Sequence, residues 1–175
     1  MSCHQPRSGP LPRLSGARAM LLGLAGLWAG SMLLAPPATA QNLELGKQVY
    51  EKANCVGCHK WHGGGGGGYG GAALSLRETA LDQDLLLEVI RCGRPATGMP
   101  YHDRHAYKQV DCYGGMSKTD LGADFPPKAA TFLRDEEVEA VVVYVATRLK
   151  GQGAPTREDC IAFWGEGARE CASMR

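Results

Sequence analysis

The sequence has little excess charge of either sign. Its 19 Lys and Arg residues nearly balance 18 Asp and Glu residues, which gives a formal net charge of +1 over 175 residues. A surface that binds nucleic acid needs a basic face, and so small a net charge gives no sign of one. We therefore expect no nucleic-acid partner.

Strand patterns, internal repeats and nucleotide-binding signatures are also absent from the sequence. No segment shows the sustained alternation of polar and apolar residues that marks a half-buried strand. A glycine-rich run occupies residues 63–71, but no Gly-Lys-Ser/Thr closes it, as a phosphate-binding loop would require. These absences predict an all-α domain. We expect the glycine run to be a flexible loop, because glycine has no side chain to bury.

The first 40 residues have the pattern of a secretory signal. Three arginines precede an apolar run at residues 19–35, and a small-residue site follows at 38–40. This pattern predicts cleavage before Gln41, export to the periplasm and no membrane attachment afterwards. An uncleaved membrane anchor is the alternative, because the apolar run is at the lower end of the spanning range. Residues 1–40 carry three arginines and no acid, so the remaining chain has a formal net charge of −2.

The most specific motif is Cys-x-x-Cys-His at residues 55–59. It is the attachment signal for a c-type haem: each thiol adds to one vinyl group, and the imidazole reaches the iron. A redox dithiol would be expected in a βαβ context, and a zinc site would need a second ligand pair at motif spacing. Neither is present. The motif therefore predicts one covalently attached haem c, held by Cys55, Cys58 and His59, with His59 as an iron ligand.

The second axial position of the iron needs another ligand. We expect Met99, which lies 40 residues after His59 between Gly98 and Pro100. A thioether is a soft donor, and His/Met ligation raises the reduction potential. The histidines near this segment are expected at the surface around the haem, and His62 is expected as an exposed residue of the glycine-rich loop. The alternative ligands are Met116, His102 and His105.

Four further cysteines remain in the exported chain: Cys92, Cys112, Cys160 and Cys171. An even number of cysteines in an exported protein suggests two disulfides. Three pairings are possible. We expect Cys92 with Cys112 and Cys160 with Cys171, because these pairs close the shortest loops. The first bridge would enclose Met99.

Apolar periodicity predicts three main helices and a short helix near the C-terminus. Asp82 and Thr156 are expected as N-caps of two of them. The segment 101–128 is long for a loop, so we expect it to contain short helical turns. The expected helices lie at residues 42–53, 82–91, 135–150 and 156–164.

Four pieces of the chain are found together: Gly46-x-x-Val49-Tyr50, residues 55–59, Gly98-Met99-Pro100 and Val143-Tyr144. On these pieces, residues 43–150 resemble a class I cytochrome c. The resemblance implies an all-α fold in which three main helices wrap one covalent haem, and in which the first and last helices cross where Gly46 meets Tyr144. The glycine run, the Cys112-containing loop and the tail depart from the common pattern. The expected organisation is therefore a signal peptide at 1–40, a cytochrome c domain at 41–150 and a disulfide-stapled extension at 151–175.

The resemblance implies a periplasmic, monomeric electron carrier that is not an enzyme. Its partners would be redox proteins: a dehydrogenase as donor, and an oxidase or another cytochrome as acceptor. One alternative is a haem subunit or dedicated acceptor of a periplasmic dehydrogenase, such as a quinoprotein alcohol dehydrogenase. Another is a haem enzyme or gas sensor with an open sixth site. In that case His62, His102 and His105 would serve as distal groups.

Overall fold

The computed structural model describes residues 38–68 and 72–174, which belong to one compact unit of the chain. Residues 1–37 of the predicted signal lie outside the described residues, so export and cleavage stay predictions. Residues 38–40 form the first turn of helix α1 (Ala38–Lys52). Every helix in the described ranges is too short or too polar to cross a membrane.

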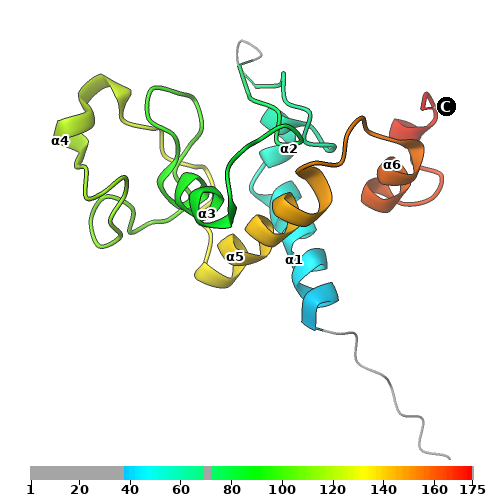
Figure 1. The fold of residues 1–175 in the computed structure, drawn as a ribbon, viewed down its shortest axis with the longest axis horizontal. Helices are drawn as coiled ribbons and strands as arrows, with labels where there is room; N and C mark the ends of the chain where they lie inside the picture. The colour runs from blue at the N-terminus through cyan, green and yellow to red at the C-terminus, as the bar shows by residue number, and fades with distance from the viewer. Residues whose placement is uncertain (1–37, 69–71, 175) are drawn as a thin grey trace, which may run out of the picture. The chain divides into compact units, whose positions relative to one another are not determined.

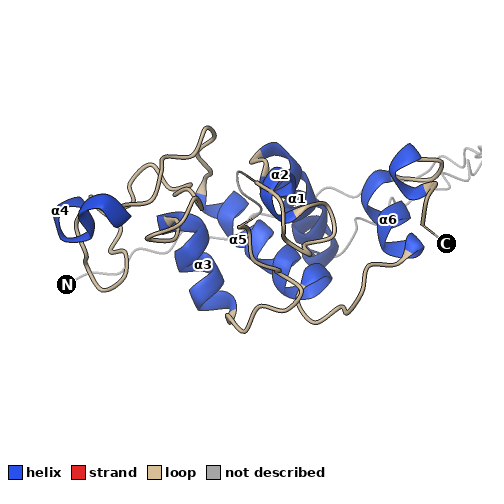
Figure 2. Cartoon of the chain, turned by 90° about the horizontal axis from the view of Figure 1, so that it is seen from above, coloured by secondary structure: helices blue, strands red, loops and turns tan. Residues whose placement is uncertain are grey.

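Three helices form the frame of the domain. Helix α5 (Asp135–Tyr144) packs against both α1 and α3 (Gln83–Cys92), and it continues into a π-helical turn, η3 (Val145–Leu149) (Figures 1 and 2). The described residues contain no strand, only isolated β-bridges at Tyr101–Lys128 and Ala106–Val110. The prediction of an all-α fold with three main helices is confirmed.

Helices α1 and α5 cross at Gly46. A Cβ atom at this position would lie 2.2 Å from the Ala140 carbonyl oxygen and 2.6 Å from Tyr144 Cβ. Glycine lowers helix stability by about 1 kcal/mol relative to alanine, so its presence here is explained by the close backbone approach. The predicted contact between Gly46 and Tyr144 is confirmed. Next to it, the rings of Tyr50 and Tyr144 lie 5.6 Å apart.

The core fills the space around this crossing with apolar side chains from α1, α3, α5, η3 and the loop before α5. The C-terminal helix α6 (Arg157–Trp164) adds Phe163, so the extension shares the core of the domain. The buried members are Val49, Tyr50, Leu86, Leu133, Val138, Val141, Val142, Tyr144, Val145, Leu149 and Phe163.

Local capping explains where two helices begin. The Asp82 carboxylate accepts a hydrogen bond from Leu85 N–H at 2.9 Å at the start of α3. At the start of α6, Thr156 Oγ1 accepts from Asp159 N–H at 3.1 Å, and Asp159 Oδ2 accepts from Thr156 N–H at 3.0 Å. These reciprocal bonds satisfy backbone donors that the first helical turn leaves free. Both predicted caps are confirmed.

The long loop and the cysteines also follow the sequence prediction. The 101–128 segment contains α4 (Lys118–Leu121) and the 3₁₀ turn η2 (Gly122–Asp124). Cys92 is bonded to Cys112, and Cys160 is bonded to Cys171. A second 3₁₀ turn, η4 (Arg169–Cys171), ends the tail. The proposed division at residue 150 between domain and extension stays a prediction.

An ion pair joins the C-terminal end of α1 to the N-terminal end of α5. Lys52 Nζ lies 2.7 Å from Glu137 Oε1, and Glu137 Oε2 accepts a hydrogen bond from Arg134 N–H at 2.9 Å. The Glu137 side chain is almost fully buried. The hydrogen bond from Lys52, followed by that from the Arg134 backbone, lowers the pKa of Glu137 from 4.5 to about 2.

This lowered pKa predicts a dependence of stability on pH. Because the folded-state pKa lies below the unfolded value, the contribution is complete above pH 4.5 and is lost as the pH falls towards 2. We expect Glu137→Gln to lower the free energy of unfolding by about 2 kcal/mol at pH 7, with the difference shrinking at acid pH. Denaturant titrations at several pH values measure this. Glu136→Gln is the matched control, because its carboxylate is exposed; an equal effect there would contradict the assignment.

Candidate haem site

The Cys-x-x-Cys-His motif forms a short helix directly after α1. Helix α2 (Cys55–His59) is separated from α1 by a tight turn at Asn54, whose φ is +61°. Asparagine adopts this left-handed conformation more readily than most residues, so the sequence allows the chain to turn sharply here. Core residues of α1 therefore fix the position of the motif. Cys55 and Val56 pack against the core cluster.

Cys55 and Cys58 are the two cysteines that form no disulfide in residues 38–68 and 72–174. Both are half-buried. Burial raises the pKa of the Cys55 thiol to about 12, so this side chain is held neutral in apolar surroundings. Two reduced thiols three residues apart fit covalent attachment to the two vinyl groups of a haem.

His59 is held in one tautomer. Its Nδ1 lies 2.9 Å from the Leu74 carbonyl oxygen. A carbonyl oxygen only accepts hydrogen bonds, so Nδ1 carries the proton and Nε2 keeps a free lone pair. Burial lowers the pKa of His59, which favours the neutral ring that an iron ligand requires. Histidines that bind metals commonly donate their other ring N–H to a backbone carbonyl in this way.

The described part of the glycine run is a loop, as predicted, and it is packed against the motif; its flexibility stays a prediction. Backbone N–H groups of the run donate to α2: Gly65 to His59 O at 3.2 Å, Gly67 to Cys58 O at 3.0 Å and Gly68 to Gly57 O at 3.1 Å. A Cβ atom at Gly67 would lie 2.4 Å from the Cys58 carbonyl oxygen. Glycine is needed here for close backbone approach. Residues 69–71 lie outside the described residues.

The backbone around Met99 is fixed on both sides. Arg94 N–H donates to the Met99 carbonyl at 3.1 Å, and Met99 N–H donates to Thr97 Oγ1 at 3.2 Å. Gly93 lies so close that a Cβ atom there would be 2.8 Å from Met99 O. The Met99 side chain is half-buried. This rigid segment suits an axial ligand, and the ligation itself stays a prediction.

The loop after Met99 is attached to the C-terminal end of α3. Tyr107 Oη donates to the Cys92 carbonyl at 2.8 Å, and Tyr113 Oη donates to the Gly93 carbonyl. The Tyr113 backbone N–H donates to Glu88 Oε1 at 2.8 Å. Together with the Cys92–Cys112 disulfide, these contacts hold the loop that follows the proposed ligand. The sequence indicated the disulfide but not the two tyrosines.

The prediction that His102 lies at the surface is wrong. Its side chain is buried, with 4% of the residue exposed, and its Nδ1 lies 3.1 Å from the Thr131 carbonyl oxygen. The reason is the backbone: His102 N–H donates to Ile90 O at 3.1 Å, which draws the residue under α3. His105 and Met116 are exposed.

His62 is half-buried, not exposed as the sequence suggested. Its Nδ1 accepts a hydrogen bond from Gly64 N–H at 3.1 Å, and its ring packs edge-on against Trp61 at 5.0 Å. Its backbone carbonyl is also bonded to the buried Arg77. These contacts tie His62 into the loop.

Comparison with known proteins identifies the domain. The family model described as Cytochrome c matches residues 43–148, which is more than half of the chain. The match begins in α1, ends in η3 and includes the Cys-x-x-Cys-His motif and Met99, while the C-terminal extension lies beyond it. No curated protein and no solved structure matches the chain.

Proposed function

The chain belongs to the cytochrome c family, and from this premise we propose that it is an exported monohaem electron carrier with His59 and Met99 as axial iron ligands. Membership of the family makes it a haem-binding electron-transfer protein with redox proteins as partners. The proposal adds that it carries one haem, moves single electrons and is not itself an enzyme. We propose that it acts as a monomer in the periplasm.

One observation carries the proposal. The neutral imidazole of His59, with Nδ1 engaged by Leu74 and Nε2 free, directly follows two thiols that are not used in disulfides. The sequence contains one Cys-x-x-Cys-His motif, which supports a single haem. When bound, the haem supplies an iron that takes up one electron and gives it up again. The task of the protein residues is to hold that iron in a fixed, water-poor environment.

The residues around the site suit this task. The Leu74 carbonyl orients His59, and the backbone bonds at Met99 limit how far its sulfur can move. Ligands that hardly move between oxidised and reduced iron allow rapid electron transfer. If His59 and Met99 both bind the iron as proposed, no position would be open for a substrate, and the protein would act as a carrier and not as an oxidase or gas sensor.

The two disulfides support the proposed location. Disulfides persist in oxidising compartments such as the bacterial periplasm, and both are formed in the described part of the chain. The signal pattern at residues 1–40 leads to the same compartment. Candidate partners there are a dehydrogenase as electron donor, and an oxidase or another cytochrome as acceptor.

Carbon monoxide binding by the reduced holoprotein tests the axial ligands. We expect the wild type to bind little carbon monoxide, because Met99 occupies the sixth position, and Met99→Ala to bind it rapidly and fully. Visible spectroscopy of the reduced protein with and without the gas measures this. Met116→Ala is the matched control and should behave as the wild type does, because Met116 is exposed. Rapid and complete binding by the wild type would overturn the carrier proposal.

A further inference from the structure

We infer that the C-terminal extension, residues 151–174, positions the haem-ligating histidine, and that Arg77 is the residue through which it does so. The extension lies beyond the part of the chain that matches the Cytochrome c family. The inference rests on the proposed role of His59 as iron ligand. Its support is a set of contacts between the extension and the segment that holds His59.

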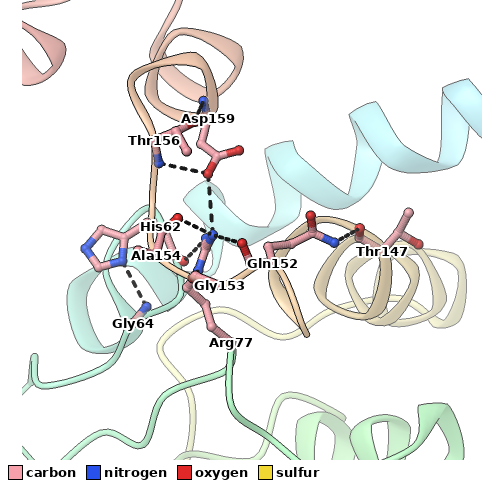
Figure 3. A network of polar contacts seen from close by, with 9 residues as sticks. All are labelled: His62, Gly64, Arg77, Thr147, Gln152, Gly153, Ala154, Thr156 and Asp159. Carbon is pink, nitrogen blue, oxygen red and sulfur yellow. Dashed lines mark hydrogen bonds and ion pairs between the residues drawn. The ribbon is translucent and has the colours of Figure 1, made fainter. Parts of the chain in front are cut away.

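Arg77 is the centre of these contacts (Figure 3). Its side chain is 5% exposed, and its guanidinium meets five oxygen atoms from two parts of the chain. One acceptor belongs to the haem-binding segment, and four belong to the extension. The acceptors are His62 O at 3.0 Å, Gln152 O at 3.1 Å, Ala154 O at 3.3 Å, Asp159 Oδ2 at 3.4 Å and Gly153 O.

Because the guanidinium of Arg77 is buried, it needs the hydrogen-bond acceptors that the extension supplies. A charged group without hydrogen-bond partners is costly to bury, and Asp159, the one carboxylate among the acceptors, is itself 41% exposed. The extension therefore supplies most of the oxygen atoms that make the burial of Arg77 tolerable. In turn, Arg77 satisfies three consecutive carbonyls of the 152–154 linker. Removing either the Arg77 guanidinium or the 152–154 segment would leave polar groups of the other without these hydrogen-bond partners.

A short run of backbone connects Arg77 to His59. Leu74, whose carbonyl accepts from His59 Nδ1 at 2.9 Å, lies three residues before Arg77. The Leu76 and Arg77 N–H groups both donate to Gly63 O, at 2.7 Å and 3.3 Å, which holds this run against the glycine loop. The Arg77 carbonyl accepts from Gly151 N–H at 2.9 Å. The run from Leu74 to Arg77 is thus fixed between the glycine loop and the extension.

The extension is itself anchored in the core. The ring of Phe163 in α6 lies 6.4 Å from that of Tyr50 and 6.1 Å from that of Trp61. Lys47 Nζ on α1 donates to the Ala162 carbonyl at 3.3 Å. Because α6 is packed against the core, the 152–154 carbonyls that precede it are held in place. This makes the extension able to restrain Arg77 and the backbone on its N-terminal side.

The chemical consequence concerns the strength of His59 as a donor. A hydrogen bond from Nδ1–H to a well-placed carbonyl makes the imidazole more basic, which favours the oxidised state of a bound iron. If the Arg77 side chain loses its contacts with the extension, residues 74–77 are no longer held in place. The Leu74 carbonyl then moves, and its hydrogen bond with His59 weakens. The reduced state of a bound iron then becomes more favourable, and the reduction potential rises. Arg77 is accordingly a positioning residue, acting through Leu74.

Arg77→Met in the full-length holoprotein tests the inference. At a fixed ambient potential we expect the ratio of reduced to oxidised protein to rise about threefold to tenfold. We also expect the His59 Nδ1 proton to exchange with solvent faster in NMR spectra. Arg157→Met is the matched control. Arg157 donates to Cys171 O and Met174 O within the extension, so its loss should leave both readouts unchanged.

A folded Arg77→Met holoprotein with unchanged potential and proton exchange would overturn the inference, as would an equal change in Arg157→Met. If Arg77→Met does not yield holoprotein, the same two measurements on Arg77→Lys decide. Lysine keeps the charge but is a single ammonium group that cannot bridge the same set of acceptors. Carbon monoxide binding by the wild type would refute the proposed carrier function alone, because the Arg77 measurements concern the His59 side of the haem.

Discussion

Replacing Gly46 with alanine is expected to lower the free energy of unfolding of the holoprotein by about 3 kcal/mol. This expected loss runs against helix propensity, which by itself favours alanine over glycine in a helix by about 1 kcal/mol. The destabilisation arises because a methyl group would lie 2.2 Å from the Ala140 carbonyl oxygen. Backbone atoms cannot rotate away as a side chain can, so α1 and α5 must separate.

Denaturant titration of the purified holoprotein measures this effect, and the yield of haem-loaded protein gives a second readout. Gln48→Ala is the matched control, because Gln48 is exposed on the same helix, where its side chain donates a hydrogen bond to Glu44 at 3.2 Å. It should change stability by a few tenths of a kcal/mol. Gly46→Val should be worse than Gly46→Ala. An alanine variant as stable as the wild type would mean that the helices do not cross at this point.

The helices and their ends could be predicted because the signals are local. Asp82 and Thr156 each stand at the start of a helical pattern of apolar residues. Each accepts a capping hydrogen bond from the backbone N–H three residues later. The disulfides could be predicted because only four cysteines remained once the haem motif and Cys3 of the predicted signal were set aside, and short loops close most easily. The contact of Gly46 with Tyr144 came from the family resemblance, not from either helix alone.

Contacts between distant parts of the chain could not be predicted in this way. Arg77 meets Gly153 and Asp159 across more than 70 residues, and Lys52 meets Glu137 across 85. A buried arginine and an exposed one look alike in a sequence. His102 was misplaced for the same reason, since its burial follows from backbone pairing with Ile90.

Composition alone did not indicate that the glycine run packs closely against its neighbours. Many glycines in succession suggest flexibility, because glycine restricts the backbone least. Here the same property serves close packing: Gly65 and Gly67 approach neighbouring backbone so nearly that any Cβ atom would collide. The loop, the tail and the glycine run were the departures from the common family pattern. In the structure, the glycine run donates backbone hydrogen bonds to the helix that carries Cys58 and His59, and the loop is bonded to Cys92 before Met99. The tail packs Phe163 against Trp61, two residues after His59.

Removing the Cys92–Cys112 disulfide is expected to lower the free energy of unfolding by about 3 kcal/mol, because it releases a loop closed over a separation of 20 residues. The double variant Cys92→Ser, Cys112→Ser should also bind more carbon monoxide when reduced. The bridge closes the segment that contains Met99, so with Met99 as the proposed ligand its loss would allow the thioether to leave the iron more often. Denaturant titration and the spectrum of the reduced protein measure the two effects.

The tail disulfide separates these two effects. Cys160→Ser, Cys171→Ser opens a shorter loop, with a separation of 11 residues, and should also lower stability by about 3 kcal/mol, because the effect depends only weakly on loop length. It should not increase carbon monoxide binding, because that loop does not contain Met99. Tyr113→Phe, which removes only the hydrogen bond to the Gly93 carbonyl, should lower stability by about 1 kcal/mol. If both disulfide variants bind carbon monoxide equally, general loosening of the fold explains the result and the Cys92–Cys112 bridge has no special hold on Met99.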